Sequence, residues 1–260
     1  MTSAPSNGPA KVRAAQDAPV LPKRFYKTAG VDEVCEGDDV SFALALDGRP
    51  ARTPAKGRLA VPSRQLAVAI AAEWNAQEEI IDPSRMPLTK LANTVIDGIV
   101  SREDRVAEEI AAFAGTDLLC YRADHPDSLV RLQAEAWDPV LDWADGEFGA
   151  RLILQTGIMP IDQPERAMAA IEKIVSARDA HELGALHVLT TLSGSAVLAL
   201  AVHHRHISPA DAWAKAHVDE DWQISQWGED AEAHARRALR EAEFLSAANY
   251  LSLHLERTTA

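Results

Sequence analysis

Residues 40–49 read VSFALALDGR, and this stretch decides the fold class. Its large apolar residues alternate with small or polar ones, and they are Val40, Phe42, Leu44 and Leu46. This alternation has the period of a β-strand with one buried face. Asp47 and Gly48 follow directly and are typical of a two-residue hairpin turn. The stretch therefore predicts an antiparallel hairpin.

Shorter strand patterns surround this hairpin. The returning strand, residues 49–53, contains Pro50, so it is expected at a sheet edge where a missing backbone donor is tolerated. Residues 24–28 and 31–35 are weaker strand candidates. Together these segments predict a small antiparallel sheet.

A helical pattern begins after the sheet. Ser63 is a suitable N-cap residue. The apolar residues that follow recur at spacings of three and four, and they are Leu66, Ala67, Ile70, Ala71 and Trp74. We expect one helix packed on the small sheet.

Beyond about residue 88 nearly all of the sequence has helical periodicity. The expected helices include residues 127–148, 164–178, 182–204, 209–226 and 229–256. The sequence therefore predicts an α+β fold with a small N-terminal α/β domain at 23–88 and a larger all-helical C-terminal domain at 89–260. Residues 1–22 are expected to form a disordered tail.

Composition excludes several classes of protein. The 260 residues carry a net charge of −13, so a nucleic-acid partner is not expected, because phosphate binding needs a field of Lys and Arg. The chain has only two cysteines, which argues against a disulfide scaffold or a Cys-rich zinc site. Residues 186–202 lack formal charge, but they are too short and too polar for a membrane span. We expect a protein that is not embedded in a membrane.

The motifs of common cofactor sites are missing. No G-K-[ST] phosphate loop and no G-x-G-x-x-G after a strand occurs in the sequence. His181 and His187 are six residues apart and cannot share a metal as the pair in a zinc-protease helix does. The Ser193-Gly194-Ser195 stretch is not a nucleophile elbow. The sequence therefore predicts neither a cofactor nor a metal, and it suggests no catalytic residue set.

The predicted helix 209–226 carries an acidic run, Asp219, Glu220 and Asp221. At 100° per residue, Glu220 falls at the centre of an apolar stripe that also holds Trp213, Ala216, Ile224 and Trp227. Two interpretations stay open at this point. Glu220 could form an internal salt bridge with an arginine of a neighbouring helix, or it could face a partner protein.

Short motifs in a fixed order along the chain resemble a family of assembly chaperones. This family binds the alpha subunit of the ATP synthase catalytic sector before that subunit joins the beta subunit. The resemblance runs from about residue 23 to beyond residue 240. It rests on Lys23-Arg24-Phe25-Tyr26, Leu46-Asp47-Gly48-Arg49, Thr53-Pro54, Glu73-Trp74 with Gln77, Met86-Pro87-Leu88-Thr89, Thr116-Asp117-Leu118-Leu119-Cys120-Tyr121, Trp137-Asp138-Pro139, Leu192-Ser193-Gly194-Ser195, Asp219-Glu220 with Gln223, and Trp227-Gly228-Glu229-Asp230.

The resemblance implies a non-enzymatic chaperone of ATP synthase assembly that shields the alpha subunit until the beta subunit replaces it. It implies partner-binding residues Asp219, Glu220, Gln223 and Trp227. A monomer is expected. The arginine-rich extension of mitochondrial members is missing, which favours the bacterial cytoplasm, with the mitochondrial matrix as the alternative.

An enzyme is the competing class. A helical hydrolase or isomerase could use Glu220 and Asp219 as acid and base beside His217. A cavity on which Glu220 and His217 converge would favour this alternative. A bidentate pair between a buried Glu220 and an arginine would instead favour a purely structural role.

Overall fold

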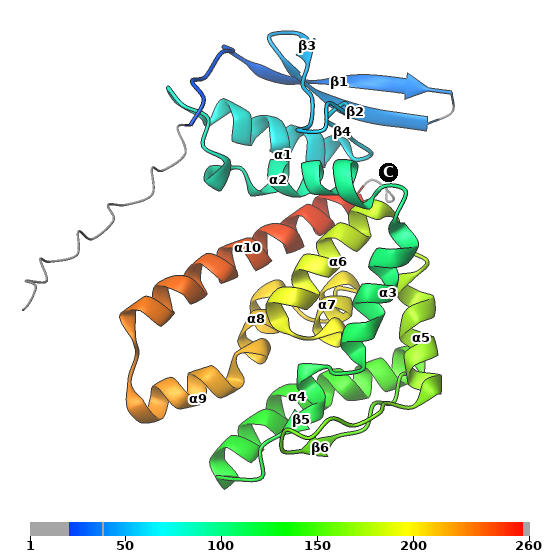
Figure 1. Cartoon of the computed structure of the whole chain (residues 1–260), viewed down its shortest axis with the longest axis vertical. Helices are drawn as coiled ribbons and strands as arrows, with labels where there is room; N and C mark the ends of the chain where they lie inside the picture. Colours follow the sequence, from blue (N-terminus) through cyan, green and yellow to red (C-terminus); the bar gives the residue numbers. More distant parts are fainter. Residues whose placement is uncertain (1–20, 38, 257–260) are drawn as a thin grey trace, which may run out of the picture.

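The structure is a computed structural model that describes residues 21–37 and 39–256. Its N-terminal sheet confirms the hairpin prediction (Figure 1). Strand β1 (Ala29–Glu36) pairs antiparallel with β2 (Asp39–Leu46) along their full length. Asp47 and Gly48 both have positive φ, 48° and 75°, as a tight hairpin turn requires. The returning strand β3 (Arg49–Pro50) pairs with β2 at an edge of the sheet, as expected, but it is shorter than the predicted residues 49–53. β4 (Ala60–Val61) also pairs with β2.

Other expectations for this region have mixed outcomes. The expected strand at 31–35 is part of β1, whereas the expected strand at 24–28 does not form. Lys23 instead makes an isolated bridge to Ile80, and the Arg24 side chain donates to backbone carbonyls, including that of Lys27 at 2.6 Å. Residues 1–20 of the expected disordered tail lie outside the described residues.

Helix α1 (Arg64–Asn75) packs against the sheet as predicted. The Ser63 hydroxyl accepts a hydrogen bond from the N–H of Leu66 at 3.3 Å, which caps the helix. The buried face consists of Leu66, Ala67, Ile70 and Ala71. Ser63 also donates to the carbonyl of Leu253 at 2.6 Å, so the start of α1 is tied to the C-terminal helix.

Glu73 of α1 fixes the next helix, α2 (Pro87–Thr94). Its carboxylate accepts hydrogen bonds from the N–H of Leu88 at 2.7 Å and from the N–H and hydroxyl of Thr89 at 2.8 and 2.7 Å. These are first-turn groups of α2 that would otherwise lack partners. Burial raises the pKa of Glu73 against the effect of these bonds. The division predicted between residues 88 and 89 falls inside α2 and stays a prediction.

The rest of the described chain is mostly helical, as predicted. A 3-10 turn (Pro83–Arg85) precedes α2, and a π-helical segment (Val95–Ile99) follows it. The remaining helices are α3 (Glu103–Ala114), the 3-10 turn Leu118–Cys120, α4 (Asp127–Phe148), α5 (Glu165–Val175), α6 (Ala180–Ser193), α7 (Ala196–His203), α8 (Pro209–Ala216), α9 (Val218–Trp227) and α10 (Ala231–Leu255). Two short strands, β5 (Tyr121–Arg122) and β6 (Gln155–Thr156), pair in parallel and are an exception to the expected all-helical part.

The layers follow from the helix contacts. α1 covers the sheet, α2 lies next to α1, and α10 runs between this layer and the other helices (Figure 1). α6 and α7 lie in the centre of the helical part, and most of their residues are buried. No helix within the described ranges is long and apolar enough to cross a membrane.

The helix expected at 182–204 is in fact two helices. Gly194 ends α6 with a φ of 72°, a left-handed conformation that glycine adopts without strain. The Ser195 hydroxyl then accepts from the N–H of Leu198 at 3.0 Å and caps α7. The apolar periodicity continues across this break because both helices are buried, so periodicity alone did not show it.

A partly buried polar network joins α6 to α7 and α10. Asp179 caps α6 by accepting from the N–H of Glu182 at 3.0 Å, and its second oxygen accepts from His254 Nε2 at 2.8 Å. The Glu182 carboxylate lies 2.7 Å from His203 Nε2. The first turn of the central helix is therefore held by charged groups.

This network predicts that acid destabilises the protein. Burial alone would raise the pKa of Asp179, but the hydrogen bonds from His254 and Glu182 outweigh it and lower that pKa. The charged form thus stabilises the native state above the unfolded pKa of about 3.9, and this contribution is lost as the pH falls through the lower folded value. In urea unfolding, Asp179→Asn should cost most stability near pH 6 and progressively less below about pH 4. The exposed Asp104→Asn serves as a control, and equal pH profiles for the two variants would contradict the prediction.

Candidate functional site

The acidic run predicted on one long helix lies on a separate short helix. The chain leaves helical geometry at His217, which has φ −118° and ψ 20°, so α8 ends at Ala216 and α9 begins at Val218. The predicted continuous stripe is therefore wrong. Trp213 is buried in the core beside Phe244, with ring centroids 5.4 Å apart, whereas Trp227 is 75% exposed.

Asp219 is held by α4. Its Oδ1 accepts a hydrogen bond from Gln133 Nε2 at 2.7 Å. Gln133 is itself buried, and its Oε1 accepts from the N–H of Ala123 at 2.8 Å. Because both ends of the Gln133 amide are occupied, Asp219 has a fixed position at the start of α9.

Glu220 and Asp221 lie near α10 instead. Asp221 makes a short hydrogen bond with Arg237, which raises the pKa of the guanidinium. Glu220 Oε2 is 4.0 Å from Arg237 Nε, a distance at which the two groups attract without a tight bond. The side chain of Glu220 is 40% exposed, whereas that of Arg237 is 18% exposed. Glu220 is therefore neither buried nor bidentate, and its carboxylate remains accessible.

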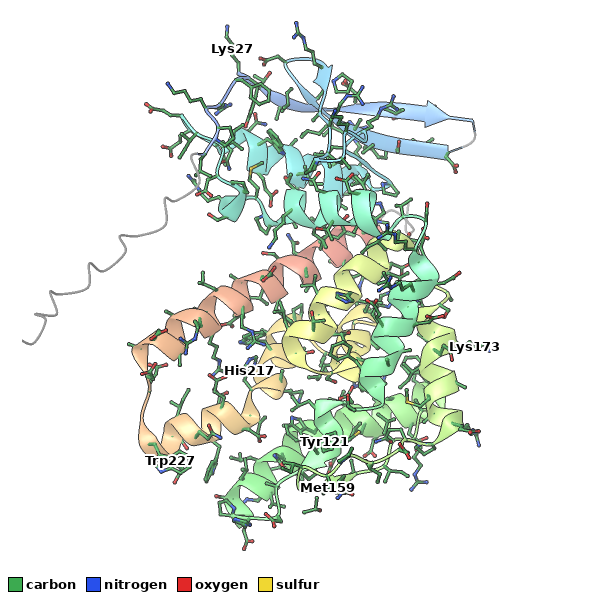
Figure 2. All side chains as sticks on the ribbon, viewed as in Figure 1. Lys27, Tyr121, Met159, Lys173, His217 and Trp227 are labelled. Atoms are coloured by element: carbon green, nitrogen blue, oxygen red, sulfur yellow. The ribbon has the colours of Figure 1, made fainter. Side chains whose placement is uncertain are left out.

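Three accessible residues of α9 share one face. Glu220, Gln223 and Trp227 are three and four residues apart, which places them along the same side of a helix. No residue of α9 is buried. Figure 2 shows Trp227 at the outer corner where α9 ends and the chain turns into α10. We name these three residues the α9 face.

Contacts on another side of α9 position Trp227. Trp222 donates from Nε1 to the Ser128 hydroxyl of α4 at 3.2 Å. The rings of Trp222 and Trp227 meet edge to face, with centroids 5.5 Å apart. Trp227 therefore has a neighbour that restricts its ring, while most of its surface stays open to water.

The acid–base alternative would need a cavity on which Glu220 and His217 converge. His217 Nδ1 lies 2.8 Å from the carbonyl oxygen of Trp213, and burial lowers the pKa of His217. A cavity of about 370 Å³ lies beside α9, and Asp221 and Arg237 are among the residues that line it. Neither Glu220 nor His217 lines this cavity. Residues 21–37 and 39–256 contain no group of three His, Cys, Asp or Glu side chains arranged to hold a metal ion.

Sequence reasoning missed the residues that surround the acidic run. The sequence predicted an arginine partner on a neighbouring helix, but it did not identify Arg237 or its preference for Asp221 over Glu220. It gave no signal for Gln133, whose importance comes from burial and from a contact 86 positions away. Only the placement of α9 between α4 and α10 brings these groups together.

Comparisons of sequence and of structure both relate this chain to the ATP12 chaperones. The family model of the ATP12 chaperone protein matches residues 23–145. The crystal structure of Atp12 from Paracoccus denitrificans is 41% identical, covers 90% of this chain and 98% of its own, and has a TM-score of 0.85. An aspartate-to-lysine mutant of the same Paracoccus protein has 40% identity and a TM-score of 0.84 over the same shares. A putative chaperone from Agrobacterium tumefaciens is 46% identical over 92% of both chains, with a TM-score of 0.85.

Proposed function

Because the chain belongs to the ATP12 chaperone family, whose members assist the assembly of ATP synthase, we propose that it binds the unassembled alpha subunit of the catalytic sector and shields it until the beta subunit replaces it. The observation that carries this proposal is the similarity to Atp12 over nearly the whole chain. The protein acts as a monomer, and the two bacterial relatives support a location in the bacterial cytoplasm.

The chemistry of such a client fits the α9 face. A subunit made before its partner exposes an interface that would otherwise be buried, and exposed apolar surface promotes aggregation. Interfaces are enriched in tryptophan at their centres, and Trp227 offers a large exposed ring. Glu220 adds an accessible carboxylate to a chain of net charge −13, which favours basic client residues.

Within this proposal the four predicted partner-binding residues have two different roles. Glu220, Gln223 and Trp227 contact the client directly through the α9 face. Asp219 lies beside this face and keeps α9 against α4 through Gln133. The interaction must also be reversible, and a short helix that buries none of its own residues gives a surface of modest size.

We expect the full-length chain to capture the isolated alpha subunit. The measurement is a pull-down with tagged protein against purified alpha subunit, beta subunit and the assembled alpha–beta complex. Alpha subunit alone should be retained, and added beta subunit should release it, because both compete for the same surface. Equal retention of all three samples, or no retention of the alpha subunit, would contradict the proposal.

A further inference from the structure

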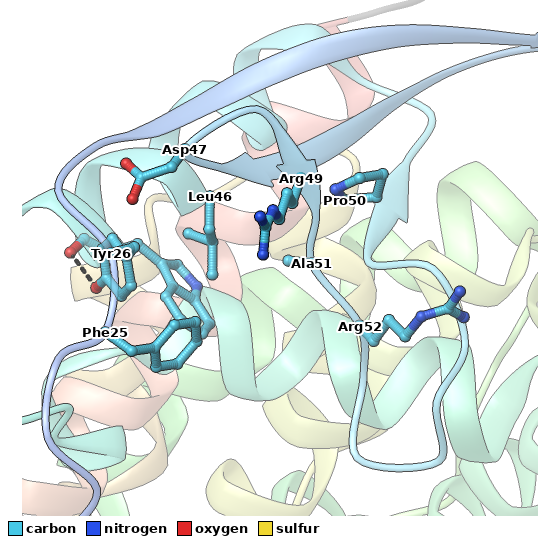
Figure 3. Close-up of a pocket in the computed structure, with 9 residues that line it drawn as sticks. Phe25, Tyr26, Leu46, Asp47, Arg49, Pro50, Ala51 and Arg52 are labelled. Carbon is cyan, nitrogen blue, oxygen red and sulfur yellow. Dashed lines mark hydrogen bonds between the residues drawn. The ribbon is translucent and has the colours of Figure 1, made fainter.

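A second surface with binding character lies in the N-terminal part, far from α9. Residues from the first segment, the hairpin and α1 line a cavity of about 600 Å³ (Figure 3). They are Phe25, Tyr26, Leu46, Asp47, Arg49, Pro50, Ala51, Arg52 and Trp74. In Figure 2, Lys27 marks this end of the molecule, opposite to the end that holds Trp227. We name it the hairpin cavity.

Three aromatic residues form one wall of the hairpin cavity. Phe25 and Tyr26 meet edge to face at 5.4 Å, and Tyr26 and Trp74 are also 5.4 Å apart. The hydroxyl of Tyr26 donates to the carbonyl of Trp74 at 2.7 Å, the dashed line in Figure 3. Tyr26 is buried, but Phe25 is 72% exposed. The wall is thus fixed in place and has an uncovered apolar ring.

The available charge in the hairpin cavity is positive. Backbone N–H groups of Lys27 and Thr28 bind the Asp47 carboxylate at 2.9 to 3.1 Å and lower its pKa, so this negative group is already engaged. Arg52 donates to the carbonyl of Lys56 at 2.8 Å and has no carboxylate partner in the described ranges. The side chain of Arg49 is exposed and makes no hydrogen bond or ion pair with another described residue. Two guanidinium groups therefore border this partly aromatic cavity on a chain of net charge −13.

The wall also contains an unused donor. The indole Nε1–H of Trp74 is shielded from solvent and has no acceptor among the described residues. A buried N–H without an acceptor is unfavourable, and the indole nitrogen can only donate. Trp74, which lines the hairpin cavity, therefore has a donor without an acceptor, and Arg49 and Arg52 have no carboxylate partner among the described residues.

We propose that the hairpin cavity binds an acidic peptide segment of a partner protein, in which a large apolar or aromatic side chain stands next to a carboxylate. The apolar side chain packs against Phe25 and Trp74, and the carboxylate pairs with Arg49, whose planar fork suits a carboxylate. A cavity of this size accommodates one large side chain and its flanking backbone. This site is opposite in charge to the α9 face and does not depend on it.

The test uses the 15N-labelled full-length chain and the peptide acetyl-Gly-Phe-Asp-Asp-Gly-amide. The signal of the Trp74 indole N–H, identified by its loss in Trp74→Phe, should shift during an NMR titration. The analogue with asparagine in place of both aspartates should bind about tenfold more weakly. Arg49→Glu should weaken binding of the acidic peptide by about tenfold, and Phe25→Ser should weaken it too.

Arg64→Glu is the matched control, because it makes the same charge change at an exposed position near the start of α1 outside the cavity. It should leave the affinity unchanged. Equal weakening by Arg49→Glu and Arg64→Glu, equal binding of the two peptides, or no shift of the Trp74 signal at about 5 mM peptide would overturn the proposal. If Arg49→Glu melts early, Arg49→Gln and the two-peptide comparison on the parent chain decide the question.

Discussion

Glu220→Lys is expected to reduce capture of the alpha subunit by well over tenfold while the protein stays folded. The carboxylate is accessible, and loss of a close interfacial charge pair commonly costs about 2 to 5 kcal/mol of binding free energy. Within the chaperone itself the change replaces a 4.0 Å attraction to Arg237 by a repulsion, and interactions of such partly exposed charges are worth about 1 kcal/mol or less. Pull-down at several alpha-subunit concentrations and a thermal melt measure the two effects.

Three further variants separate binding from architecture. Glu165→Lys is the matched control, because Glu165 is an exposed acidic residue in the first turn of α5, as Glu220 is in the first turn of α9. Trp227→Ala should also weaken capture without a change in the melting temperature, since the side chain is 75% exposed.

Asp219→Lys should lower the melting temperature, because it breaks the hydrogen bond from the buried Gln133. A collapsed melt for Glu220→Lys would assign Glu220 to architecture, and unchanged capture would show that the α9 face is not the client surface.

The features that the sequence predicted well depend on chemistry between near neighbours. The hairpin follows from alternation in β2 and from two adjacent residues that tolerate positive φ. The start of α1 follows from the hydroxyl of Ser63 and the N–H of Leu66, three residues later. In both cases all of the interacting groups lie within one window of sequence.

The breaks inside the long predicted helices depend on the surroundings. Gly194 and His217 each interrupt an apolar pattern that continues on both sides of the break. After Gly194, α7 enters the core and is buried on all sides, so its pattern shows no polar face. After His217, α9 lies on α4, is linked to α10 through Arg237, and buries none of its residues. A helical period does not show where the chain changes direction.

The acidic run shows the same limit for the candidate site. Three consecutive carboxylates have three different environments: Asp219 binds Gln133, Asp221 binds Arg237, and Glu220 remains accessible. Identical or similar side chains at adjacent positions cannot be told apart by charge. Their tasks depend on which helix each one faces, and this is set by packing between distant segments.

Trp137 is one of the residues that set this packing. Of the substitutions proposed for this protein, Trp137→Ala is expected to cause the largest loss of folding stability. The side chain is fully buried in α4, and its Nε1 donates to the carbonyl of Lys215 in α8 at 2.7 Å. Lys215 donates in return to the carbonyl of Ala136 at 3.0 Å. Arg122 lies over the ring, 5.2 Å from its centroid. One side chain therefore joins α4 to the end of α8, directly before the chain turns at His217.

Truncation of a buried tryptophan to alanine typically costs about 3 to 5 kcal/mol through lost burial and the cavity that remains. The released carbonyl of Lys215 adds to this cost if nothing else binds it. Trp137→Phe keeps much of the apolar ring but loses the N–H donor, so it should fall between the parent and Trp137→Ala. Urea unfolding measures the free energy, and a loss below about 1 kcal/mol for Trp137→Ala would contradict the prediction. Because α9 begins next to this anchor, Trp137→Ala should weaken both the stability of the fold and the capture of the alpha subunit. Trp227→Ala should weaken capture without a loss of stability.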